Sequence, residues 1–363
     1  MTNWLAIGGG ALLTLIVLRD TFETIVLPRR VTQRVRLTRI FYHVTWSPGA
    51  ALARRWRPST RREHFLALYG PLSVLALLAA WASLLICGFA LLHWGFGSRV
   101  HTAGHAGGFW TDVYLSGTTF FTLGIGDVTP TTSAGRVLTV LEAGAGFGVL
   151  ALVIGYMPIL YQAFSQREQR VSTLDAWAGS PPSALGLLRR LEQDESEVAI
   201  VSFLKDWEDW SAFVLESHLS YPVLAYFRSQ HENQSWLMAL TAILDLSAIT
   251  LSQLAGTPRW QARLTFAMAR HVALDLGRLL DAAAPPDAAD RLPPADLARL
   301  RAELSAAGYQ LHPSAEADEQ LTQLRALYEP YVHGLAGRLL LPLPDWFPAG
   351  DTRDNWLTAG SSG

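Results

Sequence analysis

The sequence is poor in cysteine and in charge. Cys87 is the single cysteine and lies within an apolar run. One thiol cannot form an intrachain disulfide, and this excludes metal sites or redox centres built from several thiolates. Charged residues make up only 17% of the 363 residues, and the formal net charge is -2. A balance so close to zero argues against a globally basic protein that binds nucleic acid.

What the chain has in abundance is apolar surface, because 50% of its residues are hydrophobic. A wholly water-soluble protein of this composition would have to bury an unusual amount of apolar area, so a membrane portion is the simpler interpretation. Long apolar runs and helical periodicities are present, whereas strand-like alternation of any length is not. The sequence therefore predicts an all-α membrane protein.

Three segments have the composition of membrane helices. Residues 1–28 contain an apolar run shorter than the ~20 residues that cross a bilayer, so a spanning helix must continue through charged positions toward Leu27. A signal anchor or an interfacial segment is the alternative there. The run 65–94 is long and carries no acidic or basic charge, and the run 137–161 is interrupted only by Glu142. These two runs are predicted to span.

Positive charge predicts the orientation of these helices. Segment 29–63 contains ten arginines, whereas 95–109 contains one. Because arginine-rich loops stay on the inner side, 29–63 is predicted to be a cytoplasmic linker, lying either along anionic lipid or free in solvent. The amino terminus and residues 95–136 are then outside the cell membrane, and everything after Tyr161 is in the cytoplasm.

The outer segment contains a run that does not fit a simple loop. Thr111 or Asp112 could cap a short helix that ends at about Phe120, enters the membrane from outside and points its negative end inward. The backbone after this helix must leave the membrane without helical hydrogen bonds, which is allowed only where it is buried in protein or lines water. Four copies around an axis would meet that condition; an external hairpin with glycine turns is the alternative.

The residues that follow have the chemistry of an ion filter. Gly124 and Gly126 accept backbone conformations that are closed to other residues, so successive carbonyl groups can point to a common axis. Rings of carbonyl oxygens replace the hydration shell of a potassium ion. Thr122 would add a ring of hydroxyl groups at the inner end, and Leu123 and Ile125 are expected to pack outward.

The pattern Thr119-x-x-Thr122-x-Gly124-x-Gly126, followed by Asp127, resembles the signature of bacterial pore-loop potassium channels. Its position between two predicted spans, on the predicted outer side and after a short helical stretch, makes the resemblance more specific than the motif alone.

The resemblance implies a pore domain at 64–165, with its filter at 122–127, preceded by one extra membrane helix. It further implies K+ as the permeant ion and a homotetramer in the lipid bilayer. Ile125 stands where most members of the family have Tyr or Phe, which puts the sharpness of K+ over Na+ selection in doubt. Thr118 stands where some members carry a buried carboxylate.

Four residues are predicted to support the filter: Thr118, Thr119, Asp127 and Glu142. A carboxylate inside the bilayer is expensive and should face protein or water. A hydrogen bond behind the filter, to Thr118, is the favoured role of Glu142. A charge that faces the pore and concentrates cations is the second possibility, and a polar contact that only holds helices together is the third.

The inner helix carries candidate gate positions. In the channels that the sequence resembles, the inner helix has a glycine hinge at about Gly146 and proline kinks nearer the cytoplasmic mouth. The resemblance therefore implies hinge points at Gly144, Gly146 and Pro158, where glycine weakens the helix and proline removes a hydrogen bond, and where bending would open or close the pore. The alternative is that the glycines only permit close helix packing in lipid.

Beyond the pore domain the sequence predicts a linker at 166–182, a helical cytoplasmic domain at 183–347 and a tail at 348–363. The apolar run 236–251 is predicted to be a buried helix rather than a fourth span, and the tryptophans of the domain to be core residues. A helix is also predicted over 315–341. An unidentified ligand or protein partner of this domain is possible on sequence grounds.

Taken together, these features predict a channel subunit for passive K+ conduction. Its gate lies at the inner helix, and the helical domain biases the opening of this gate. Enzymatic activity and a covalently held cofactor are not expected. One alternative is a weakly selective cation channel. Another is a membrane-anchored sensor or scaffold whose pore is vestigial.

Overall fold

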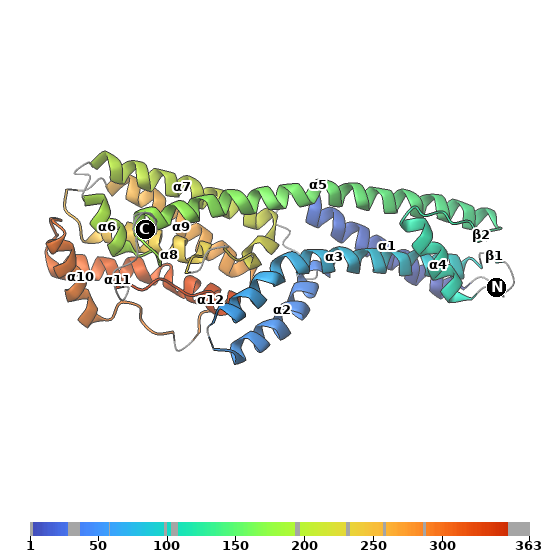
Figure 1. Ribbon diagram of the computed structural model, residues 1–363, viewed down its shortest axis with the longest axis horizontal. Coiled ribbons are helices and arrows are strands. Elements are labelled where there is room, and N and C mark those ends of the chain that lie inside the picture. The colour runs from blue at the N-terminus through green and yellow to red at the C-terminus, as the bar shows by residue number, and fades with distance from the viewer. Residues whose placement is uncertain are drawn as a thin grey trace, which may run out of the picture. The chain divides into compact units, whose positions relative to one another are not determined.

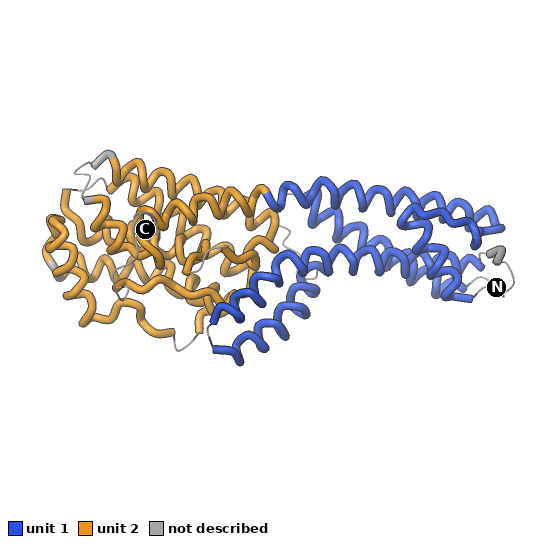
Figure 2. Tube along the Cα trace, viewed as in Figure 1, with its two compact units in different colours: residues 1–161 blue, residues 162–363 orange. Residues whose placement is uncertain are grey.

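The computed structural model describes residues 3–27, 37–57, 59–97, 100–102, 108–192, 197–229, 233–256, 259–285 and 288–347. The predicted tail at 348–363 and residues 29–36 of the arginine-rich linker lie outside these residues. The chain forms two compact units, residues 1–161 and 162–363 (Figure 2). Nearly all the regular structure described is helical (Figure 1), which confirms the predicted all-α fold.

Three helices of the described residues are long and apolar enough to cross a membrane: α1 (Trp4–Ile25), α3 (Thr60–Gly95) and α5 (Ser133–Ala178). They coincide with the three predicted spans. The first span does continue beyond its short apolar run, because α1 extends through Asp20 to Ile25.

Helix α1 packs on α3 through small residues. A Cβ atom on Gly10 would lie 2.7 Å from the Gly88 carbonyl oxygen, and one on Gly88 would lie 2.5 Å from Thr14 Oγ1. Glycine therefore permits the close approach of the two backbones, as in many membrane helix pairs. The Asn3 N–H donates to the Gly95 carbonyl at 2.8 Å, which fixes the outer ends of the helices together.

A buried carboxylate links α1 to the next two helices. Asp20 is 5% exposed and accepts hydrogen bonds from Trp81 Nε1 at 3.0 Å and from Thr38 Oγ1 at 2.7 Å. Thr38 belongs to α2 (Leu37–Arg55), the described helical part of the arginine-rich linker, and Trp81 belongs to α3. A carboxylate inside a membrane unit needs such partners, and here they tie three helices together.

The outer segment folds into a short helix between two short strands. The strands β1 (Val100–Thr102) and β2 (Val128–Pro130) pair antiparallel. Between them lies α4 (Phe109–Phe120), which ends where the sequence predicts. Its N-cap is Gly108, so the prediction of Thr111 or Asp112 as the cap was wrong. Both residues lie in the first turns of the helix instead.

The inner helix is longer than the sequence analysis expects. Polar residues after Phe164 predict a linker at 166–182, but α5 continues without interruption through Pro158 to Ala178. The change in composition marks a change of environment rather than the end of the helix. The same helix therefore belongs to the membrane unit and to the helical unit.

The second unit is built around one central helix. All 17 residues of α8 (Trp236–Ser252) are buried, which confirms that this run is a core helix and not a candidate span. The helices around it are α6 (Ala184–Glu192), α7 (Glu197–Ser220), η1 (Pro222–Tyr226), α9 (Arg259–Leu279), α10 (Pro294–Ala306), α11 (Ser314–Ala326) and α12 (Glu329–Leu339).

Buried charge is paired inside this unit. Asp245 of α8 accepts hydrogen bonds from Arg291 Nη1 at 3.2 Å and from the Tyr328 hydroxyl at 2.5 Å. Burial raises the pKa of Tyr328 well above its ordinary value, so the phenol stays protonated and donates. Tyr328 also marks a break, because the single helix expected over 315–341 is divided at residues 327–328 into α11 and α12.

Candidate functional site

The predicted filter begins directly at the end of α4. The carbonyl oxygen of Thr118 accepts hydrogen bonds from the N–H groups of Leu123 at 2.8 Å and Gly124 at 3.4 Å. The last carbonyl groups of a helix lack partners within the helix, and here the following segment supplies them. Residues 122–124 are thereby held at the negative end of α4, where a cation is favoured.

The backbone of the predicted filter has a positive φ at every second residue, and the sequence predicts this only at the glycines. Gly124 has φ +56° and Gly126 has φ +83°, as their predicted role requires. Thr122 also has φ +56°, although threonine rarely adopts this region. Left-handed residues at every second position turn successive peptide groups in the same sense, so their carbonyls can face one side. The strain at Thr122 is the clearest sign of function in this segment.

The whole filter segment is exposed in the single chain. Residues 121–127 are all exposed, and the side chains of Leu123 and Ile125 are 63% and 60% accessible. Irregular backbone is not tolerated facing lipid at membrane depth, because its polar groups need hydrogen-bond partners.

An aromatic hydroxyl fixes the outer end of the filter. Tyr114, on α4, donates a hydrogen bond from its hydroxyl to Asp127 Oδ2 at 3.0 Å, and the N–H of Val128 donates to Asp127 Oδ1 at 3.0 Å. Ile125 replaces the Tyr or Phe of most family members, so a hydrogen bond from such a ring to the short helix is absent. Here the short helix supplies the ring and the filter end supplies the acceptor. In the sequence, only the presence of an aromatic hydroxyl at Tyr114 and a carboxylate at Asp127 could have indicated this hydrogen bond.

Glu142 has a different partner from the one favoured on sequence grounds. It is completely buried, and its Oε2 lies 3.4 Å from Nε2 of His93, which is also completely buried, on α3. Ser116 of α4 lies next to the same carboxyl group. The predicted bond to Thr118 was wrong, because the Thr118 hydroxyl donates to the Leu115 carbonyl at 2.9 Å. His93 was not recognised as part of the site.

The two candidate hinge glycines differ in their surroundings. A Cβ atom on Gly146 would collide with the backbone of Phe120, the last residue of α4, approaching its carbonyl carbon to 3.0 Å. A Cβ atom on Gly144 would meet nothing within 4 Å. Gly146 thus marks the place where the inner helix touches the start of the filter segment. Whether either glycine or Pro158 bends stays a prediction.

On the second unit, a buried arginine joins the end of α5 to the helical domain. Arg167 is completely buried, and its guanidinium donates to the carbonyls of Leu224 and Phe227, each at 2.8 Å. Arg167 Nη1 also lies 3.1 Å from Nε2 of His218, whose Nδ1 lies 2.9 Å from the Val214 carbonyl. Because the arginine can only donate, His218 accepts at Nε2 and donates from Nδ1. Burial, followed by the charge of Arg167, lowers the pKa of His218 well below its ordinary value.

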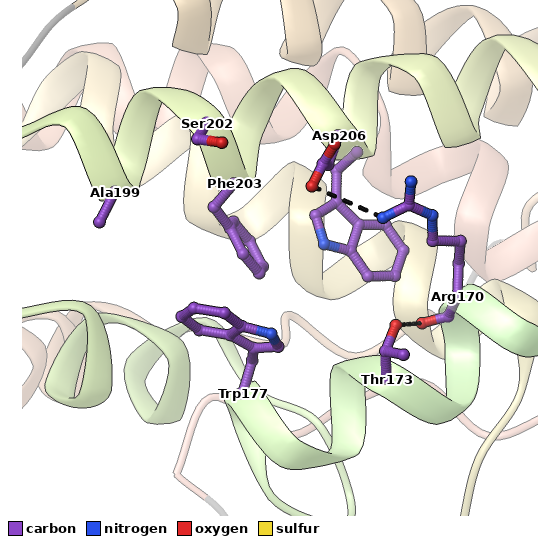
Figure 3. A pocket seen from close by; sticks show the side chains of 8 residues that line it. Arg170, Thr173, Trp177, Ala199, Ser202, Phe203 and Asp206 are labelled. Atoms are coloured by element: carbon purple, nitrogen blue, oxygen red, sulfur yellow. Dashed lines mark hydrogen bonds and ion pairs between the residues drawn. The ribbon is translucent and has the colours of Figure 1, made fainter.

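A pocket of about 250 Å³ lies beside this junction, between α5 and α7 (Figure 3). Trp177 faces Phe203 across it, with ring centroids 5.6 Å apart, and Arg170 pairs with Asp206 at 3.5 Å. Both charged side chains are about half exposed. The pocket therefore adds an aromatic contact and a weak ion pair to the junction made by Arg167.

Comparison with known proteins gives the class of the first unit. Residues 74–163 match the family model Ion_trans_2, which is described as Ion channel. This match covers α3 from residue 74, α4, the predicted filter and α5 as far as residue 163, and it confirms the resemblance to two-helix pore-loop channels over this segment. The protein is a membrane protein with an ion-channel domain.

A relative that aligns with about half of the chain gives less information. The chain is 26% identical over 200 residues to the "Uncharacterized membrane protein YdjJ" of Bacillus subtilis (strain 168). The aligned region covers 51% of this chain and 54% of that protein, so the chain spans about half the length of this relative. No solved structure matches the chain.

Proposed function

We propose that this protein is one subunit of a homotetrameric channel for passive, potassium-selective conduction. The observation that carries the proposal is the alternation of left-handed backbone at Thr122, Gly124 and Gly126 in a segment that begins at the end of a short helix. Such a segment can present a column of carbonyl oxygens, and rings of carbonyls replace the water around K+. Leu123 and Ile125 contribute their carbonyls to the same column.

The exposure of the filter segment supports an oligomer, and the number four comes from the resemblance to pore-loop channels. One chain supplies one pore loop, and its exposed segment 121–127 becomes permissible in a bilayer only when other protein or a water-filled pore covers it. A ring of identical chains with closed symmetry provides both. Thr119, Asp127 and the cluster at Glu142 would then support each copy of the filter from outside the axis.

Charge supports the proposed orientation in the cell membrane. The segment 29–63 contains ten arginines. The positive-inside rule then places this segment and the helical unit in the cytoplasm, and the amino terminus and α4 toward the outside. The short helix would point its negative end into the membrane, where it favours a cation.

The reversal potential tests the proposed selective conduction directly. Full-length protein would be purified, its mass in detergent measured, and the protein reconstituted in lipid bilayers with K+ on one side and Na+ on the other. A selective channel gives a reversal potential close to the K+ equilibrium value. A monomeric protein, or one that passes no ions, contradicts the proposal.

The departure at Ile125 favours one second candidate, a weakly selective cation channel. An isoleucine side chain cannot make the hydrogen bond that an aromatic hydroxyl makes, and it is 60% exposed in the single chain. The hydrogen bond from Tyr114 to Asp127 favours the selective channel instead, because it restrains the filter end. A reversal potential near zero in the same bilayers would identify the weakly selective channel.

We further propose that the helical unit biases the gate through α5. Helix α5 is continuous from Ser133 to Ala178. Its residue Arg167 donates to the carbonyls of Leu224 in η1 and of Phe227 directly after it, and contacts the His218 ring of α7. A ligand or protein that shifts the helical unit would therefore act on the helix that carries Gly144, Gly146 and Pro158. The pocket in Figure 3 is the place where such a partner could reach α5.

Replacement of Arg167 by methionine should uncouple the helical unit from the gate in α5. Methionine fills a similar volume but removes the guanidinium donors. The Leu224 carbonyl keeps its bond from the Phe227 N–H, whereas the Phe227 carbonyl loses its side-chain donor, and an unsatisfied buried group costs about 1–3 kcal/mol. We expect the helical unit to unfold at lower denaturant and the open probability in bilayers to change.

Arg170→Met is the matched control, because Arg170 lies one turn away and its ion pair is half exposed at 3.5 Å. Such a pair contributes at most about 1 kcal/mol. An unchanged open probability in Arg167→Met, with the helical unit destabilised, would contradict coupling through α5.

A further inference from the structure

A cluster of buried ionisable side chains lies where α3, α4 and α5 come together. His93 and Glu142 are both completely buried, with His93 Nε2 3.4 Å from Glu142 Oε2. Asp112, in the first turn of α4, is 5% exposed and also interacts electrostatically with His93. The imidazole of α3, the outer helix of the pore domain, therefore interacts with one carboxyl group of α4 and one of α5, the inner helix.

Several polar atoms of this cluster have no hydrogen bond of good geometry within the part of the chain that the structure describes, although Glu142 lies close to His93 and Ser116. They are both carboxyl oxygens of Glu142, Oδ1 of Asp112 and Oγ of Ser116. An unsatisfied buried polar group costs about 1–3 kcal/mol, and native proteins usually satisfy such groups with ordered water. Glu142 lies next to Ser116, which is one turn from Asp112 on the same helix face. The site thus calls for an occupant that can both donate and accept hydrogen bonds.

The charge of the cluster points to bound protons. With both carboxyl groups ionised and His93 neutral, the cluster would carry two negative charges inside the membrane unit. A single charge at the bilayer centre already costs about 2.5–3.5 kcal/mol on insertion scales. No group of three or more His, Cys, Asp or Glu among the described residues has an arrangement that could hold a metal ion.

Among the residues that the structure describes, the neighbouring elements do not supply a neutralising cation. Helix α1, which packs on α3, has no ionisable side chain between Trp4 and Leu18. Arg136, at the outer end of α5, is exposed, and its Nε donates to the Pro130 carbonyl. The groups of the described part of the chain that face the site are therefore two acids, one imidazole and the Ser116 hydroxyl.

We propose that Asp112, Ser116, Glu142 and His93 form a buried proton-binding site, filled by ordered water, that holds α4 against the inner and outer helices. Two bound protons neutralise the two carboxylates and turn charge repulsion into a hydrogen-bonded network. Loss of a proton leaves a net negative charge in a low-dielectric site, which favours separation of α4 from α5. Because the filter begins at the end of α4, conduction is expected to fall as the pH rises.

Infrared spectroscopy tests the proton site without any ion flux. Exposed carboxyl groups are ionised at about pH 7, since their ordinary pKa is ~4. Purified full-length protein should nevertheless show the carbonyl stretch of a protonated carboxylic acid at that pH, and Glu142→Gln and Asp112→Asn should each weaken it. Asp209→Asn, at a carboxyl group 65% exposed, should leave the band unchanged. Absence of the band from the unmodified protein would overturn the proposal.

The consequence for conduction rests on the proposed channel function and has its own test. K+ flux into liposomes would be measured as the external pH is raised from about 6 to about 9, a range that spans the ordinary histidine pKa. We expect flux to fall on the order of tenfold in the unmodified protein, or about 1.4 kcal/mol, and to change little with pH in Glu142→Gln. Flux that is independent of pH, or an unchanged pH dependence in Glu142→Gln, refutes the coupling to the filter. An infrared band without any flux would support the proton site and reject the channel.

Discussion

Substitution of Gly124 by alanine should abolish K+ flux while leaving the oligomer assembled. Gly124 has φ +56°, a conformation that costs an L-residue about 1–2 kcal/mol. In a four-fold ring the same strain occurs four times, roughly 4–8 kcal/mol in total, and it can be relieved only by rotating the peptide groups that present the carbonyls. The chain leaves open space around Gly124, so the methyl group itself does not disturb the fold of the subunit.

The measurement is K+ uptake into liposomes, combined with the mass of the purified complex. Gly117→Ala is the matched control: Gly117 lies in α4, where its added Cβ would meet nothing within 4 Å, and a helical backbone accepts alanine readily. Normal flux through Gly124→Ala would reject the carbonyl-ring mechanism. Loss of flux in both variants would show that the whole region tolerates no added methyl group. The result would then give no evidence for a specific role of Gly124.

The features of the fold that are local in sequence could be predicted. Three long apolar runs became α1, α3 and α5, and the short helix before the glycines ends at Phe120 in the structure. The apolar run of α8 was correctly assigned to the core because it is short and contains Asp245, which is bound to Arg291 and Tyr328. Length, hydrophobicity and embedded charge are sufficient for such assignments.

The end of the inner helix could not be predicted from composition. Polar residues from Gln166 onward indicate that the chain leaves the apolar environment, but glutamine, glutamate and arginine are good helix formers, and α5 continues to Ala178. The chain segment that was expected to be a linker is instead helical. The two glycines and Pro158 lie in the same helix as the buried Arg167.

The supports of the filter were also out of reach, because they join residues that are distant in the sequence. Tyr114 could be placed on the short helix, yet nothing local shows that its hydroxyl reaches Asp127. His93 lies in an apolar run and becomes meaningful only when Glu142 is found 3.4 Å away. Pairings of this kind are set by tertiary packing, which local patterns do not encode.

Substitution of Gly146 by alanine should destabilise the channel, in contrast to the same change at Gly144. A Cβ atom at position 146 would collide with the carbonyl group of Phe120, which cannot rotate away because Phe120 belongs to α4. Overpacking of this kind typically costs about 1–3 kcal/mol in each subunit, and it would displace the start of the filter. At Gly144 the space is open, and alanine in a helix is favoured over glycine by about 1 kcal/mol.

The two substitutions therefore have opposite expected signs on the same helix. Thermal unfolding of the assembled protein in detergent should occur at lower temperature for Gly146→Ala and at equal or higher temperature for Gly144→Ala, with flux lost only in the former. A hinge role without a packing role predicts another pattern: both variants keep their unfolding temperature and differ only in open probability. That pattern would contradict the close approach of α5 to Phe120, on which the position of the filter against the inner helix depends.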